Sequence, residues 1–210
     1  MKGRRLEVAS DVSGAAFFLV AGLLLPGSDL TIQGVGLNPT RTALLDVLRS
    51  MGAAIEITRS EVRNGEMVGD LRVRRPSSGA AIEGGLIAGE TTAGVIDEIP
   101  VLAVLGAHSR QGIEIRDAAE LRVKETDRIA TVAENLGRLG VEVETLPDAM
   151  RIPGNQKFHA AELDSFGDHR IAMAFVIAAL AADGPCTMHD AEAASVSFPE
   201  FYEVLDRLRV

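Results

Sequence analysis

The sequence predicts an α/β (α+β) fold in which three repeated βαβαββ units share a core of buried helices, with the sheets on the outside. The first observation behind this fold class is an apolar segment opened by an aspartate, which occurs at Asp11, Asp97 and Asp168. In each copy a glycine follows 15 or 16 residues later and leads into a short run of β-forming residues. The second observation is an amphipathic helical pattern after each run, and the third is a strand pattern after the first two amphipathic helices.

The three apolar segments are expected to be helices buried on all sides, because a helix without a polar face has no side to turn to water. Two of them contain long apolar runs, at residues 14–26 and 171–182. Both runs are well short of the ~20 residues that a transmembrane helix needs, so they predict core helices and no membrane partner. The aspartates that open the segments are candidate N-caps.

Capping residues bound the amphipathic helices that follow. Their expected N-caps are Asn38, Thr126 and Ser197. Ser197 and Glu200 also have the spacing of a capping box. Gly52 and Gly140 stand 14 residues after the first two caps, where a C-terminal glycine is expected.

A pair of strands closes each of the first two units: residues 53–60 with 70–75, and residues 141–146 with 149–154. The stretch 59–70 is expected to be the most flexible. In the third unit the glycine before such a pair would fall at position 211, one beyond the last residue, so the closing strands are missing. Either this repeat has decayed or its strands come from elsewhere in a longer chain. Since no linker interrupts the pattern, residues 1–210 are expected to form a single domain.

The net charge of −9 argues against a nucleic-acid partner, because nucleic-acid-binding surfaces are usually basic. It does not exclude small anionic ligands, since a local group of Arg and Lys can oppose the overall sign. The single cysteine, Cys186, excludes an internal disulfide and is expected to be a buried strand residue. Residues 1–14 lack the pattern of a secretory signal, so the expected location is cytoplasmic.

The densest group of charges lies just before the second amphipathic helix. It consists of Arg122, Lys124, Glu125, Asp127 and Arg128. A helix N-terminus favours anions, yet this one carries both acids and bases. One interpretation is a solvated cap that neutralises itself, and the other is a site for anionic ligands.

The stretch LRVKETDRI, residues 121–129, resembles the signature of the 5-enolpyruvylshikimate-3-phosphate synthases, also called 3-phosphoshikimate 1-carboxyvinyltransferases. GDHRIAMAF, residues 167–175, resembles the second C-terminal motif of that family. VIDEIP, NPTRT and SFPEF occur in the expected order, and the resemblance covers essentially the whole chain. It implies an enolpyruvyl-transferase-like domain that corresponds to the C-terminal half of the family, with the N-terminal domain absent. The extreme N-terminus of the family adds to its C-terminal domain, which would explain the unfinished third unit.

Members of the family transfer the enolpyruvyl group of phosphoenolpyruvate to the 5-hydroxyl of shikimate-3-phosphate, a step of the shikimate pathway of aromatic amino acid biosynthesis. The resemblance therefore implies both compounds as ligands, a tetrahedral intermediate, and neither a metal nor an organic cofactor. Such chemistry needs carboxylates that move protons and cations that offset the ligand charge. It also implies a complementary N-terminal half as partner, since the family is about twice as long as this chain.

Two carboxylates carry the catalytic roles that the resemblance implies. Asp97 matches the family residue that contacts the shikimate ring hydroxyls and is the proposed base; the alternative is a plain helix N-cap. Glu125 matches the proposed proton donor to the methylene carbon. It can also form an ion pair with Arg128 three residues on, and the two roles can coexist.

The resemblance implies a group of substrate-binding residues as well. Lys124 matches a lysine near the 5-hydroxyl, and Arg128 and Arg170 match the pair that clamps phosphoenolpyruvate, a task that suits the planar guanidinium. His169 matches a histidine that lines the site, where it either contacts the ligand or supports a residue that does. Arg41 is either a further anion contact or part of a solvated helix start.

The chain departs from the family at several positions. Val196 stands where many members have a lysine, and Glu120 stands where some have an asparagine that contacts the shikimate phosphate. Residues 88–94 are small and polar where the family is often bulky and apolar. The N-terminal ligand-binding groups have no counterpart here. The chain alone is therefore expected to be inactive, with Arg128 and Arg170 facing solvent.

Two other functions stay open. The chain could be a non-catalytic module that binds anions or completes a complementary chain. It could also resemble the related UDP-N-acetylglucosamine enolpyruvyl transferases, but these lack the KETDR sequence, and their loop cysteine has no match in the strand-like surroundings of Cys186.

Overall fold

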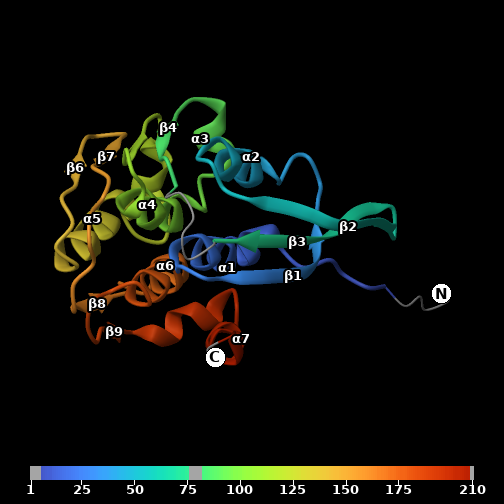
Figure 1. Ribbon diagram of the computed structural model, residues 1–210. Helices are drawn as coiled ribbons and strands as arrows, with labels where there is room; N and C mark the ends of the chain where they lie inside the picture. Colours follow the sequence, from blue (N-terminus) through green and yellow to red (C-terminus); the bar gives the residue numbers. More distant parts are fainter. Residues whose placement is uncertain (1–5, 76–81, 209–210) are drawn as a thin grey trace.

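The computed structural model describes residues 6–75 and 82–208. Residues 1–5, part of the segment used above to predict the cellular location, lie outside the described residues. Within the described part, three units built from short sheets and helices surround a central group of helices (Figure 1). The predicted α/β (α+β) fold with three repeated units is confirmed.

The central helices are α1 (Val12–Leu24), α4 (Ile99–His108) and α6 (His169–Ala179). They contact one another and lie side by side in the middle of Figure 1. Nearly every residue of α1 and α4 is buried, and α6 is buried over most of its length. The prediction of three buried apolar helices is therefore confirmed, and one hydrophobic core runs through all three units. None of the helices in the described residues is long and apolar enough to span a bilayer.

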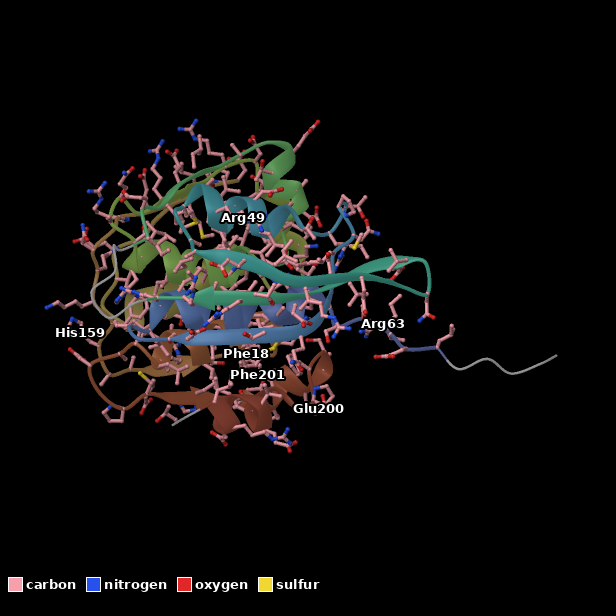
Figure 2. All side chains as sticks on the ribbon, turned by 45° about the vertical axis from the view of Figure 1, so that its right-hand side comes forward. Phe18, Arg49, Arg63, His159, Glu200 and Phe201 are labelled. Atoms are coloured by element: carbon pink, nitrogen blue, oxygen red, sulfur yellow. The ribbon has the colours of Figure 1, made fainter. Side chains whose placement is uncertain are left out.

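The first unit ends in an antiparallel sheet of order β1-β3-β2. Its elements after α1 are β1 (Asp29–Gly36), α2 (Ala43–Ser50), β2 (Ile55–Arg63) and β3 (Glu66–Arg74). Residues 59–70, the stretch expected to be the most flexible, form the ends of β2 and β3 around a tight turn. Asn64 and Gly65 both have positive φ there, which suits a two-residue hairpin turn. Figure 2 shows Arg63 near the protruding end of this hairpin, where it binds Glu7 at 2.8 Å.

The second unit repeats this plan around α4. It comprises β4 (Gly85–Ile87), α3 (Glu90–Gly94), α4, β5 (Ile113–Ile115), the 3-10 helix η1 (Ala119–Val123), α5 (Arg128–Arg138), β6 (Glu144–Thr145) and β7 (Met150–Ile152). The strand order is β4-β5-β7-β6, with β4 parallel to β5 and the closing pair antiparallel. A parallel bridge between Ser10 and Val35 occupies the β4–β5 position in the first unit.

The third unit has the parallel pair but no closing pair within the described residues. It comprises β8 (Glu162–Asp164), α6, β9 (Thr187–His189), the 3-10 helix η2 (Ala191–Val196) and α7 (Phe201–Leu208). Helix α7 packs on α1 through Phe201, whose ring centroid lies 5.7 Å from that of Phe18 (Figure 2). The prediction that Cys186 is a buried strand residue is wrong. Cys186 is only half-buried and precedes β9, and the sheet β8–β9 has two strands in the described residues.

The predicted caps of the amphipathic helices are wrong in all three units. Asn38 accepts from the backbone N–H of Thr40 at 3.1 Å, and α2 starts only at Ala43. Asp127 rather than Thr126 caps α5, accepting from the N–H of Ala130 at 3.0 Å. In these two units the predicted cap residue is not the one next to the first turn of the helix.

The third predicted cap fails for a backbone reason. The N–H of Ser197 bonds to the carbonyl of Ala194 at 3.3 Å, so Ser197 ends η2 instead of starting a helix. Helix α7 begins at Phe201, and the capping box with Glu200 does not form.

Glycines let the sheets approach the central helices closely. A Cβ at Gly106 in α4 would lie 2.2 Å from Cγ2 of Ile113 in β5, and one at Gly22 in α1 would lie 2.7 Å from Cγ1 of Val73 in β3. Neither contact could exist with a larger residue, so these two positions hold each sheet directly on its helix.

Candidate active site

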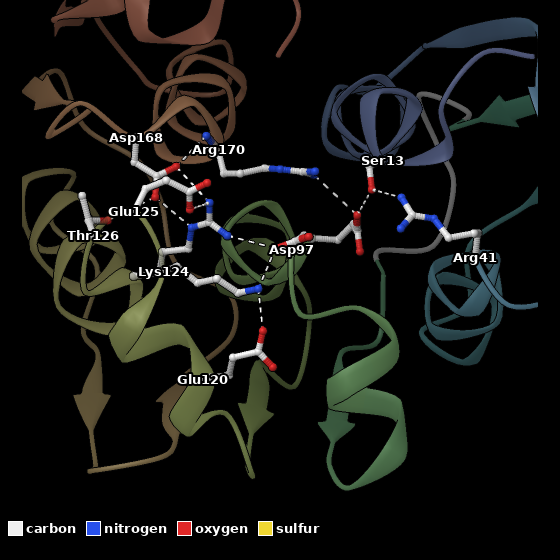
Figure 3. Close-up of polar contacts among 11 residues, drawn as sticks. Ser13, Arg41, Asp97, Glu120, Lys124, Glu125, Thr126, Asp168 and Arg170 are labelled. Atoms are coloured by element: carbon white, nitrogen blue, oxygen red, sulfur yellow. Dashed lines mark hydrogen bonds and ion pairs between the residues drawn. The ribbon is translucent and has the colours of Figure 1, made fainter. Parts of the chain in front are cut away.

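The predicted site residues gather where the N-terminal ends of the central helices meet the start of α5 (Figure 3). Asp97 lies just before α4, Lys124 and Glu125 connect η1 to α5, and Arg128 opens α5. Arg170 lies in the first turn of α6. These five residues come from two units, and the fold brings them to one place.

Arg128 is the centre of the group and is only 1% exposed. Its Nη1 lies 3.1 Å from Oδ1 of Asp97, its Nη2 lies 2.6 Å from Oε2 of Glu125, and its Nε lies 2.8 Å from Oδ2 of Asp168. One buried cation therefore holds three carboxylates. Burial acts to lower the pKa of Arg128, but the bond and charge of Asp168, with the other two carboxylates, outweigh it.

Asp168 is fully buried and is the N-cap of α6. It accepts from the backbone N–H of Arg170 at 2.8 Å and from the hydroxyl of Thr126 at 3.2 Å, in addition to Arg128. Burial acts to raise the pKa of Asp168, but the bond and charge of Arg128 hold it below its ordinary value. A carboxylate with this many donors is a structural anchor for the guanidinium beside it.

Asp97 is one of two carboxylates around Arg128 that stay accessible: its side chain is 40% exposed, and that of Glu125 is 50% exposed. Besides Arg128, its Oδ1 lies 3.4 Å from Nζ of Lys124. Partial burial acts to raise the pKa of Asp97, but the charges of Arg170, Lys124 and Arg128 together hold it below its ordinary value. Asp97 is therefore ionised at neutral pH. The alternative interpretation of Asp97 as an N-cap is wrong, since α4 starts at Ile99 with Glu98 as its cap residue.

Lys124 lies between two carboxylates, Asp97 and Glu120. Its ammonium lies 2.6 Å from Oε1 of Glu120, and its side chain is 21% exposed. The bond to Glu120 is the main cause that raises the pKa of Lys124, and the charge of Asp97 adds to it. Glu120 thus holds the lysine in the charged form beside Asp97.

Arg170 belongs to a second chain of polar contacts that leads away from Arg128 (Figure 3). Its Nη1 lies 3.5 Å from Oε1 of the buried Glu98. The same carboxylate oxygen accepts from the hydroxyl of Ser13 in α1, and Nη2 of Arg41 lies 3.4 Å from that hydroxyl. Arg41 also lies 3.4 Å from Asp11, the N-cap of α1. Contacts therefore run across all three units.

His169 is half-buried at the start of α6. Burial is the main cause that lowers the pKa of His169; the charge of Arg170 adds to this effect and that of Asp168 opposes it. The imidazole is consequently neutral at pH 7.

The expectation that both arginines face solvent is wrong. Arg128 is buried by its three carboxylates, and the side chain of Arg170 is only 13% exposed. The sequence motifs contained Asp168 and Glu98, but their contacts with these arginines were missed, as was Ser13. The signal available was an acid next to a motif residue, with Glu98 after Asp97 and Asp168 before His169. This signal does not say which cation the acid meets.

Val196, at which a departure from the family was expected, is exposed to 77% at the end of η2. Arg41 has a side chain that is 57% exposed and remains close to the site through Ser13. Within residues 6–75 and 82–208, no group of three His, Cys, Asp or Glu side chains is placed to hold a metal ion. The expected independence from metals and organic cofactors stays a prediction.

Residues 1–205 match the family model of EPSP synthase (3-phosphoshikimate 1-carboxyvinyltransferase). The chain is 61% identical over 208 residues to the 3-phosphoshikimate 1-carboxyvinyltransferase of Solibacter usitatus, covering 99% of this chain and 48% of that protein. It is 50% identical over 210 residues to the enzyme of the same name from Koribacter versatilis, with coverages of 99% and 48%. The chain thus spans about half the length of the curated relatives it matches.

Solved structures agree with the sequence comparison. EPSP synthase from Acinetobacter baumannii matches with a TM-score of 0.91 at 34% identity, covering 99% of this chain and 48% of that one. The enolpyruvyl transferase NikO from Streptomyces tendae matches with a TM-score of 0.75 at 23% identity over 96% of this chain and 43% of that one, a likeness that concerns the fold alone.

Proposed function

The chain belongs to the EPSP synthase (3-phosphoshikimate 1-carboxyvinyltransferase) family, and from this premise we propose that it forms the C-terminal half of such an enzyme. The complete enzyme would transfer the enolpyruvyl group of phosphoenolpyruvate to the 5-hydroxyl of shikimate-3-phosphate. In this proposal residues 1–210 are one domain, and a complementary N-terminal half supplies the remaining ligand contacts. We also propose a cytoplasmic setting, because a chain whose only cysteine is Cys186 needs no oxidising compartment.

The observation that carries the proposal is the meeting of three cations at one accessible carboxylate. Lys124, Arg128 and Arg170 all lower the pKa of Asp97, and Asp97 keeps 40% of its side chain exposed. A solvated helix start whose acids and bases merely neutralise one another would not need a cation from a second unit. An ionised base surrounded by fixed cations suits a reaction between two anionic ligands.

The proton transfers can be assigned to two carboxyl groups. Asp97 accepts the proton of the 5-hydroxyl while the oxygen of this hydroxyl bonds to the C2 carbon of phosphoenolpyruvate. In the same step protonated Glu125 gives its proton to the methylene carbon. In the second step Glu125 takes back a proton from the new methyl group as the C–O bond to phosphate breaks, and Asp97 gives its proton to the leaving phosphate, so that both carboxyl groups return to their starting states. Glu125 suits this exchange, since its side chain is 50% exposed and fixed at one oxygen by Arg128.

The cations would hold the ligands in position. Most donors of Arg128 are already engaged, so a ligand phosphate or carboxylate would have to replace Glu125 or Asp97 at the outer edge of the guanidinium. Arg170 lies 3.5 Å from Glu98 through Nη1 and can offer its other N–H donors to a ligand. Lys124 lies next to Asp97, where the attacking hydroxyl would be bound.

This half of the site is expected to be inactive alone. Orienting both ligands and excluding water can lower an activation barrier by ~7–11 kcal/mol. Both tasks need a second domain that covers the ligands. The test is phosphate release from phosphoenolpyruvate and shikimate-3-phosphate, measured for the purified chain and for the chain mixed with the N-terminal half of the Solibacter usitatus relative. Turnover only in the mixture supports the proposal.

Two outcomes would contradict the proposal. Turnover by the chain alone would mean that the site is complete without a second half. A mixture that forms a complex and binds both ligands without releasing phosphate would favour the non-catalytic module.

A further inference from the structure

Glu98 is a buried carboxylate beside the site that the proposed mechanism does not use. It is 7% exposed, and its Oε1 is shared by two donors, the hydroxyl of Ser13 and Nη1 of Arg170. The three residues lie on α1, before α4 and on α6, so this one oxygen joins the central helices of all three units (Figure 3).

A buried carboxylate is costly unless it is paired, and replacing a whole buried ion pair by well-packed apolar side chains is often neutral or stabilising. Glu98 makes no capping bond to α4 with its side chain. Its contacts instead point sideways, to a hydroxyl and to a guanidinium. Capping of α4 therefore does not explain why an acid occupies this position.

Arg170 shows what the acid does. An arginine side chain has many rotamers, and a ligand that meets an unfixed guanidinium must immobilise it. Here the backbone N–H of Arg170 is bound by Asp168 at 2.8 Å, which fixes the base of the side chain, and Glu98 meets the guanidinium at its other end. The hydroxyl of Ser13 donates to the shared oxygen of Glu98 and keeps it in place. Nη2 of Arg41 lies 3.4 Å from Oγ of Ser13.

We propose that Glu98 is a positioning residue, which holds the guanidinium of Arg170 in its ligand-binding orientation before an anionic ligand arrives. This inference rests on the proposed function, because it assigns Arg170 to phosphoenolpyruvate binding. Ser13 supports Glu98 and has a weaker effect of the same kind.

The orientation of Arg170 can be tested on this chain without any activity. The probe is the Nε–Hε resonance of Arg170 in NMR spectra of the nitrogen-labelled protein, assigned from the signal that disappears in Arg170→Lys. In Glu98→Gln this resonance should shift, and its order parameter should fall toward that of a free side chain, with a smaller change in Ser13→Ala. The matched control is Glu134→Gln, which removes a glutamate 2.6 Å from Arg138 on α5 and should leave the Arg170 signal unchanged.

The catalytic consequence is tested in the mixture with the N-terminal half. Glu98→Gln should raise KM for phosphoenolpyruvate about tenfold, as expected for one charge-assisted contact that is no longer prearranged, with kcat changed much less. In an Arg170→Ala background the same substitution should have no further effect on KM, because Glu98 acts through Arg170.

Each result decides one point. An unchanged Arg170 resonance in Glu98→Gln, or an effect on KM that persists in the Arg170→Ala background, would overturn the positioning role. A fall in stability with an unaltered Arg170 signal would show a merely structural acid. If the wild-type mixture has no turnover, the proposed function fails, and the NMR measurement still decides whether Glu98 fixes Arg170.

Discussion

Arg128 and Asp168 form an ion pair in which neither side chain reaches solvent: their exposures are 1% and 0%, and Nε lies 2.8 Å from Oδ2. The pair joins the start of α5 in the second unit to the start of α6 in the third. It therefore fixes the relative position of the two motifs that contain the predicted site. A charge pair at this depth contributes to stability only as long as both partners are present and ionised.

Asp168→Asn should lower the unfolding free energy by about 3 kcal/mol at pH 7, because it leaves Arg128 buried with only its outer partners. The pKa of Asp168 is lowered in the folded state, so its contribution is present above the unfolded value of about 3.9 and is lost as the pH falls through the folded value. The difference between the two proteins should shrink below about pH 4. Urea unfolding at pH 7, 5, 4 and 3 measures it, and a gap that stays constant over this range would contradict the prediction.

Glu125→Gln should abolish turnover in the mixture of the two halves while the fold stays intact. The amide cannot give a proton to the methylene carbon, and the half-exposed ion pair with Arg128 contributes no more than about 1 kcal/mol. Phosphate release and urea unfolding measure the two effects. Glu134→Gln, which removes a similar pair with Arg138 outside the site, is the control and should retain turnover. Wild-type turnover by Glu125→Gln would remove Glu125 from the mechanism.

His169→Gln should flatten the decline of stability between pH 7 and pH 5. Burial lowers the pKa of His169 in the folded protein, whereas the unfolded value is about 6.5. The stability that comes from this neutral imidazole is therefore present above the unfolded value and is lost as the pH falls toward the folded one. Unfolding free energies of both proteins at pH 7 and pH 5 test this, and the wild type should lose more. Equal losses would show that His169 titrates alike in both states.

Gly106→Ala and Gly137→Ala should change stability in opposite directions, although both glycines are helical. A Cβ at Gly106 would lie 2.2 Å from a side-chain atom of Ile113, so this change should cost about 1–3 kcal/mol. A Cβ at Gly137 would meet nothing within 4 Å, so alanine should stabilise α5 by about 0.5–1 kcal/mol. Thermal and urea unfolding measure both, and a tolerated alanine at Gly106 would mean that α4 and β5 can separate.

Local patterns were sufficient to predict much of the fold. The apolar segments became α1, α4 and α6, the alternating segments became the closing strands, and the third unit lacks that pair in the part of the chain that the structure describes. Each of these features depends on side-chain periodicity within one segment, which a sequence displays directly. The caps failed because Asn38, Thr126 and Ser197 each had a better local or tertiary partner than the helix N-terminus.

The sequence by itself determined which residues could form a site. Its motifs contained Asp97, Lys124, Glu125, Arg128 and Arg170. Only the tertiary structure decided how these charges are used: Arg128 is buried among three carboxylates, and Arg170 is held by Glu98. The reason is that an ion pair depends on distance and burial, and both are set by the meeting of segments that lie far apart along the chain.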